Sequence, residues 1–204
     1  MDSEAYLNRI SAQARRIKNG NGGLLNSTLF KVLAGVVIGL TVFMIMAGIL
    51  GSGESVKDKL SALKVHTTNL SELITTYQPY LKSTALRSNS ASLNSVLTNT
   101  NNGLGTYLLE KYKVEDDKGL SKSLAQKEAD QKEKLEEDLF SARINGLINR
   151  TFASKMAYEI TIITTREREI IKLTNKEDLK NILETSLNSL DNLYNNFNNY
   201  SEAR

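Results

Sequence analysis

The sequence of 204 residues has no cysteine and no tryptophan, one proline, and one histidine, His66. Without cysteine, the chain cannot build a disulfide scaffold, a zinc finger, an iron–sulfur site or a cysteine nucleophile. A single imidazole also excludes any site that needs two, such as the di-iron centre of a ferritin-like bundle. We therefore expect no bound metal and no cofactor.

Catalytic motifs are also missing. The sequence contains no Gly-rich phosphate loop, no G-x-S-x-G elbow, no H-E-x-x-H pair and no dinucleotide fingerprint. Residues 115–119 (EDDKG) resemble the start of a calcium loop, but the alternating ligands and the closing glutamate are absent. The acids of residues 127–138 alternate with lysines, as on a solvated helix.

His66 lies off the apolar stripe of its segment and is expected at the surface. The sequence thus predicts no catalytic, cofactor-binding or metal-binding residue and a protein that is not an enzyme. An envelope hydrolase with convergent acidic groups is the weakest of the alternatives.

The net charge of +3 is confined to the N-terminal segment. Residues 1–31 hold five basic and two acidic residues, whereas the rest of the chain holds 21 of each. A nucleic-acid-binding face needs an excess of lysine and arginine on the folded body. We therefore expect no nucleic-acid partner.

A long apolar run follows this basic segment. Residues 29–50 would form a helix of about 33 Å, enough to cross a bilayer, and residues 32–50 carry no charge. The run is apolar on every face, which argues against a buried helix of a soluble protein. A cleaved secretory signal is the alternative, but its apolar core is usually only 7–15 residues long. The sequence favours a retained signal-anchor in contact with the lipid bilayer.

The basic residues also predict the orientation of this span. Five lie on its N-terminal side, counting Lys31 just inside the span, and three lysines lie within the twenty residues that follow, so the positive-inside rule favours a cytoplasmic N-terminus. The predicted protein is therefore single-pass in a cell membrane, with an extracytoplasmic C-terminal domain. The tail, residues 1–28, is either an interfacial helix on the inner leaflet or a disordered topology signal. Gly35 and Gly39 form a GxxxG motif, a candidate contact for a homodimer.

Residues 51–204 predict an all-α domain. Four segments, 54–77, 80–113, 120–174 and 174–200, carry apolar stripes that step by three and four residues, and none alternates like a strand. Such segments predict an antiparallel, four-helix-type bundle. The third would be over-long, about 82 Å if continuous. Its charged first half is expected to project beyond the bundle or to fold back after a break, and Gly146 is the weak point.

The last segment ends with aromatic residues between pairs of asparagines. Tyr194, Phe197 and Tyr200 are candidate partner contacts, and the alternative is a role in the core at the end of the bundle. The plan of an N-terminal anchor and a helical bundle resembles bacterial envelope proteins and receptor sensor domains, a likeness of architecture without shared residue motifs. We expect an interaction or scaffold module with a protein partner. The alternative is a ligand-binding or sensing bundle, because the stripe of residues 86–107 includes small polar side chains.

Overall fold

A computed structural model of the chain describes residues 55–114 and 119–200. The described residues form helices and connecting turns and contain no strand, which confirms the all-α prediction. In chain order the helices are α3 (Val56–Tyr77), the short 3-10 helix η1 (Gln78–Tyr80), α4 (Thr84–Tyr112), α5 (Lys122–Ile144), α6 (Ile148–Leu173) and α7 (Glu177–Asn198).

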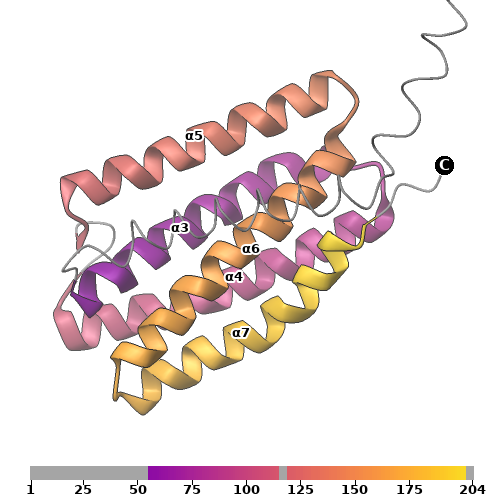
Figure 1. The fold of residues 1–204 in the computed structure, drawn as a ribbon. Coiled ribbons are helices and arrows are strands. Elements are labelled where there is room, and N and C mark those ends of the chain that lie inside the picture. The colour runs from indigo at the N-terminus through magenta and orange to yellow at the C-terminus, as the bar shows by residue number, and fades with distance from the viewer. Residues whose placement is uncertain (1–54, 115–118, 201–204) are drawn as a thin grey trace, which may run out of the picture. The chain divides into compact units, whose positions relative to one another are not determined.

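Four of the helices form a ring, and the fifth lies on its outer side (Figure 1). α3 contacts α4, α4 contacts α7, α7 contacts α6, and α6 contacts α3. Neighbours in this ring run antiparallel, as predicted for a helical bundle. α5 packs mainly against α3 and α6, and its Arg143 also contacts Tyr80 of η1. Its outer side faces solvent.

The prediction of one over-long helix is wrong, because the chain breaks at Gly146. This glycine has a φ of +72°, a conformation that side-chain-bearing L-residues rarely adopt. The amide of Leu147 donates to the carbonyl of Ala142 at 2.8 Å, and that of Gly146 donates to Arg143 at 3.3 Å. These are the two hydrogen bonds of a Schellman helix end. The charged half therefore becomes α5 and folds back on the bundle.

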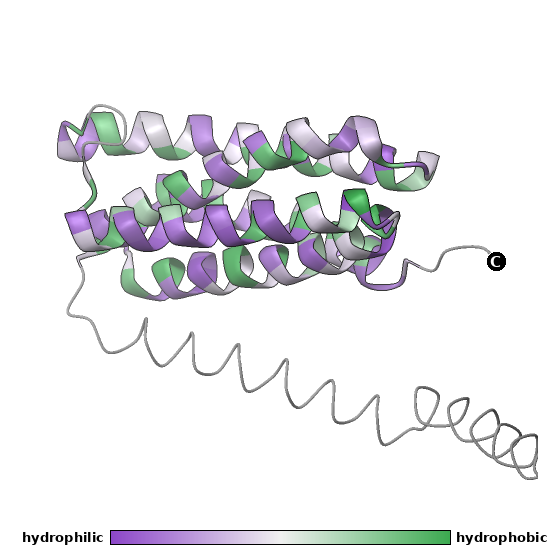
Figure 2. Ribbon diagram, turned by 90° about the horizontal axis from the view of Figure 1, so that it is seen from above, coloured by the Kyte–Doolittle hydropathy of each residue, from purple (hydrophilic) through white to green (hydrophobic). Residues whose placement is uncertain are grey.

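The core is built on the predicted apolar stripes. One face of each ring helix turns inward, and hydrophobic and hydrophilic residues alternate along the helices in Figure 2. Phe152 of α6 and Phe197 of α7 pack with ring centres 6.2 Å apart. Each fully buried Leu, Ile or Phe contributes roughly 1.5–3 kcal/mol of transfer free energy. The fully buried large side chains include Leu60, Leu63, Leu70, Ile74, Leu86, Leu93, Leu97, Leu104 and Leu108.

The many serine, threonine and asparagine residues of α4 are used at its contact with α3. Asn101 is hydrogen-bonded to Thr67 and Thr68, and Asn94 is hydrogen-bonded to Ser71 and Thr75. Paired polar groups of this kind fix one register between two helices, because a shift would leave them without partners. These hydrogen bonds explain how a segment of poor helix propensity forms a regular helix here.

None of the described helices is both long enough and apolar enough to cross a membrane. The predicted span, residues 29–50, and the predicted tail, residues 1–28, lie outside the described residues, as do Gly35 and Gly39.

Candidate functional site

The prediction that His66 is a surface residue is wrong. Its exposed fraction is 6%, because α5 folds back over this side of α3. His66 is buried together with three charged residues: Glu128 of α5, and Glu159 and Arg166 of α6. We call these four residues the ionic cluster.

The imidazole of His66 lies between two carboxylates. Its Nδ1 is 2.9 Å from Oε2 of Glu128, and its Nε2 is 3.0 Å from Oε2 of Glu159. Nη1 of Arg166 lies 2.8 Å from the other oxygen of Glu128. The His66–Glu159 and Arg166–Glu128 contacts are ion pairs by distance, although neither nitrogen makes a well-angled hydrogen bond. Glu128 therefore connects α5 to both α3 and α6.

The pKa values of His66 and Glu128 are both shifted toward the charged form. Burial and the charge of Arg166 oppose protonation of His66, but Glu128 and Glu159 outweigh them, so the pKa of His66 is raised above its usual value. Burial alone would raise the pKa of Glu128, but His66 and Arg166 outweigh it, so the pKa is lowered. His66 and Glu128 thus face one another as opposite charges, which compensates for their burial.

The arrangement does not offer room for chemistry on a substrate. The cavity beside it, between α3 and α5, has a volume of about 10 Å³, about enough for one water molecule. The two ring nitrogens point to different carboxylates, so the ligand atoms do not converge on one point. Across residues 55–114 and 119–200, no group of three or more histidine, aspartate or glutamate residues could hold a metal ion. We interpret the ionic cluster as the attachment of α5.

A third buried acid, Glu167 of α6, lies beside Ser186 of α7. Glu167 has no exposed surface, and neither carboxyl oxygen has a hydrogen-bond partner of good geometry. Burial raises the pKa of Glu167 to about 8, although the nearby Ser186 hydroxyl and Arg168 lower it. The carboxyl is therefore mostly neutral at pH 7. The Ser186 hydroxyl is also 3.0 Å from the Thr100 hydroxyl. Glu167 of α6, Ser186 of α7 and Thr100 of α4 therefore form a row of neighbouring polar groups.

An open groove runs between α4 and α7, with Thr100 and Ser186 among its lining residues. Its volume is about 400 Å³, within the range of small-molecule sites. No charged residue lines it, and its surface combines hydroxyl and amide groups with the methyl groups of Val96 and Ile182. The other lining residues are Asn99, Gly103, Asn181, Thr185 and Ser189. The groove has the chemistry to hold a small polar molecule.

A third feature lies at the end of the bundle where α3 leads into α4 and α5 leads into α6. We call this end the tip, and define it by residues 78–90, 139–154 and 192–200. Four large apolar side chains are exposed there: Tyr80, Phe140, Ile144 and Leu147, the last two at 66% and 56%. The guanidinium carbon of Arg143 is 4.5 Å from the ring centre of Tyr80 and 5.1 Å from that of Phe140. Both are cation–π contacts.

The tip also carries an excess of positive charge. Its three segments contain four basic residues, Lys82, Arg87, Arg143 and Arg150, and no acidic residue, and the acids directly before two of the segments, Asp138 and Asp191, are paired with Lys155 and Arg168. Lys82 and Arg150 belong to neighbouring elements, because the amide of Lys82 donates to the side chain of Asn149 at 2.9 Å. The body of the chain is neutral as a whole, so this local excess is a product of the fold.

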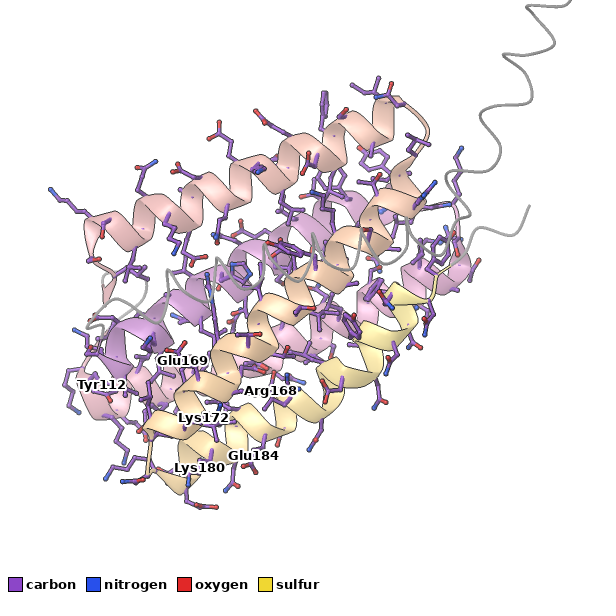
Figure 3. All side chains as sticks on the ribbon, in the orientation of Figure 1. Tyr112, Arg168, Glu169, Lys172, Lys180 and Glu184 are labelled. Carbon is purple, nitrogen blue, oxygen red and sulfur yellow. The ribbon has the colours of Figure 1, made fainter. Side chains whose placement is uncertain are left out.

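The opposite end of the bundle mixes both signs. Figure 3 labels side chains of α4, α6 and α7 that lie toward the start of α3, among them the bases Arg168, Lys172 and Lys180 and the acids Glu169 and Glu184. Glu169 pairs with Lys59 of α3 at 2.6 Å. The apolar and basic character of the tip is therefore not a general property of the bundle surface.

Of the predicted partner contacts on α7, Phe197 is buried against Phe152, whereas Tyr194 and Tyr200 are half-buried at the rim of the core. A partner contact through these residues stays a prediction.

The ionic cluster was missed by the sequence analysis, although the spacing carries a signal. Glu128 lies seven residues before Leu135, in line with Leu139 and Ala142, so it occupies an inward-facing position of α5. Glu167 likewise lies in line with Ile160, Ile163 and Ile170 on α6.

Comparison of the chain with protein-family models, with curated proteins and with solved structures finds no match in any of the three.

Proposed function

We propose that this protein is a single-pass, membrane-anchored helical bundle that acts as an extracytoplasmic interaction or scaffold module for another protein. The anchor and orientation rest on the apolar run of residues 29–50 and on the basic residues that precede it. The interaction function rests on the tip, where apolar and aromatic side chains are exposed together.

The exposed side chains of the tip are the observation that carries this proposal. Single exposed apolar residues are ordinary, but a contiguous group on a folded protein marks a contact surface. Tyr80, Phe140 and Arg143 belong to residue types that are enriched at protein interfaces. The tip combines these residue types with the exposed Ile144 and Leu147 and with the exposed bases Lys82, Arg87 and Arg150.

In-cell photocrosslinking tests the proposal. A photoreactive amino acid replaces Leu147 at the tip, and a second strain carries it at the exposed Asn188 on α7 as a matched control. We expect one reproducible protein adduct from position 147 and none of the same mass from position 188. If position 147 gives no adduct, or both positions give the same set, the tip is not a partner surface and the proposal fails.

Ligand binding in the groove between α4 and α7 is a second candidate function. The observation in its favour is the uncharged, hydroxyl-lined groove of about 400 Å³ with the unpaired Glu167 behind Ser186. A thermal-shift screen of small polar molecules against the full chain tests it, with Thr185→Phe as a variant that fills the groove. Hits that stabilise both proteins equally would argue against binding in the groove.

A further inference from the structure

Arg143 contacts two aromatic rings at the tip. Its guanidinium carbon lies near the rings of both Tyr80 and Phe140. Among the ion pairs of the described residues, none involves Arg143. A guanidinium presents five N–H donors in a planar fork that matches a carboxylate. No carboxylate of the described residues takes up this role within ion-pair distance.

The electrostatic field around Arg143 favours the same kind of partner. Lys82, Arg87 and Arg150 are exposed on the elements that surround it. The nearest acids along α5 are Glu136, Glu137 and Asp138, and Asp138 is paired with Lys155 of α6. Four cations on one small surface attract a negatively charged partner and raise its rate of association.

The apolar side chains add a second requirement. Phe140, Ile144 and Leu147 remove apolar area from water only if the partner brings apolar side chains of its own. A purely acidic tail would meet the cations and leave these residues exposed. A partner segment with acidic and large apolar residues interleaved satisfies both parts of the tip.

The composition of the tip favours a protein over a bilayer as the occupant. Tyr80, Phe140 and Arg143 are of residue types enriched at protein interfaces. The tip lies at the end of the bundle opposite the first residue of α3, about 33 Å along that helix at 1.5 Å per residue.

We infer that the tip is a docking surface for an acidic, apolar segment of a partner protein, in which Arg143, in contact with Tyr80 and Phe140, binds a partner carboxylate. This inference rests on the proposed interaction function and names the chemistry of its partner.

A binding assay with a defined probe tests this inference. The full chain is placed in phosphatidylcholine nanodiscs, and the probe is a fluorescent peptide that alternates Asp or Glu with Leu or Phe. The control peptide replaces every acid by Lys. We expect saturable binding of the acidic peptide that weakens with added salt, and no binding of the basic one. Equal binding of both peptides would show that the tip does not select acids and would overturn the inference.

Two substitutions of Arg143 and one control separate the carboxylate contact from general charge. Arg143→Gln should weaken peptide binding about tenfold, as expected for one lost hydrogen bond to a charged group. Arg143→Lys should recover only part of the affinity, because lysine keeps the charge and loses the planar fork. Arg168→Gln, at an exposed position on α6, should bind like the unchanged chain. Equal thermal unfolding of all three would establish that they fold.

Two results would overturn the inference without overturning the proposed function. One is an unchanged adduct at position 147 in cells that carry Arg143→Gln. The other is preferential binding to vesicles of phosphatidylglycerol and phosphatidylcholine in equal parts, which would assign the tip to a lipid surface. Absence of any adduct at position 147 would instead contradict the proposed interaction function itself.

Discussion

Individual buried residues of this bundle make contributions to stability that change in opposite directions with pH. The raised pKa of His66 means that its contribution to stability is fully present below pH 6.5 and is lost as pH rises through the folded-state pKa. The lowered pKa of Glu128 gives the reverse, a contribution present above pH 4.5 and lost as pH falls through its folded-state value. Glu167 acts like His66, because its folded form keeps a proton that the unfolded chain releases.

Replacing Glu167 by glutamine should flatten the decline of stability with pH. Between pH 4.5 and about 8 the folded chain holds the Glu167 proton and the unfolded chain does not, so the free energy of unfolding falls by up to about 1.4 kcal/mol per pH unit. Glu167→Gln removes this pH-dependent contribution. The stability of the variant, measured against that of the unchanged chain, should therefore be higher at pH 8 than at pH 5. Urea unfolding at both pH values measures the difference. Glu184→Gln, at an exposed position on α7, is the control and should leave the slope unchanged.

At the scale of the helices, α5 buries the fewest apolar residues of the five described α-helices. Its buried residues are Glu128, Leu135, Leu139 and Ala142, whereas α6 buries fourteen residues. Two exposed ion pairs add to its contacts, Lys132 with Glu72 of α3 and Lys155 of α6 with Asp138. Exposed pairs of this kind contribute at most about 1 kcal/mol each. The ionic cluster and the turn at Gly146 therefore decide where α5 lies.

Two glycine-to-alanine substitutions should have effects of opposite sign. Gly146→Ala introduces a side chain at a φ of +72°, which costs about 1–2 kcal/mol, although no atom lies within 4 Å of the new Cβ. Gly105→Ala lies inside α4, where its Cβ makes an ordinary 3.6 Å contact with Lys64, and should stabilise by about 0.5–1 kcal/mol. Thermal unfolding monitored by circular dichroism measures both. A neutral or stabilising Gly146→Ala would show that the break does not depend on this conformation.

At the scale of the whole molecule, charge is distributed unevenly in two ways. The sequence places its net +3 before the apolar run, and the fold collects four bases at the tip of a body that is neutral as a whole. The first asymmetry predicts orientation in a membrane, and the second predicts the chemistry of a partner.

Cysteine labelling in intact cells tests the predicted topology. Because the chain has no native cysteine, Ser11→Cys and Ser201→Cys each create a unique thiol. A membrane-impermeant maleimide should label position 201 and should label position 11 only after the cells are lysed. Labelling of position 11 alone in intact cells would reverse the orientation, because the basic residues would then lie outside.

The sequence by itself determined the helical class, the inward stripes of α3, α4, α6 and α7, and the location of the net charge. The class and the stripes follow from local spacing, because a period of three and four residues identifies the buried face of a helix whatever it packs against. The location of the net charge follows from counting charged residues along the chain. The spacing could not identify the neighbour of each face. For that reason the spacing predicts a surface position for His66 and a solvated helix for the segment of Glu128, and it predicts residues 120–174 as one helix with a single apolar stripe.

Only the tertiary structure decided which of these side chains are buried and which are exposed. The reversal at Gly146 places α5 against α3 and α6, which buries Glu128 beside His66 and leaves Phe140, Ile144 and Leu147 at an exposed corner. It also brings residues 78–90 and 139–154, far apart in the chain, to the same end of the bundle. The physical reason is that burial and net charge at a surface depend on contacts between distant segments, which a local pattern does not contain.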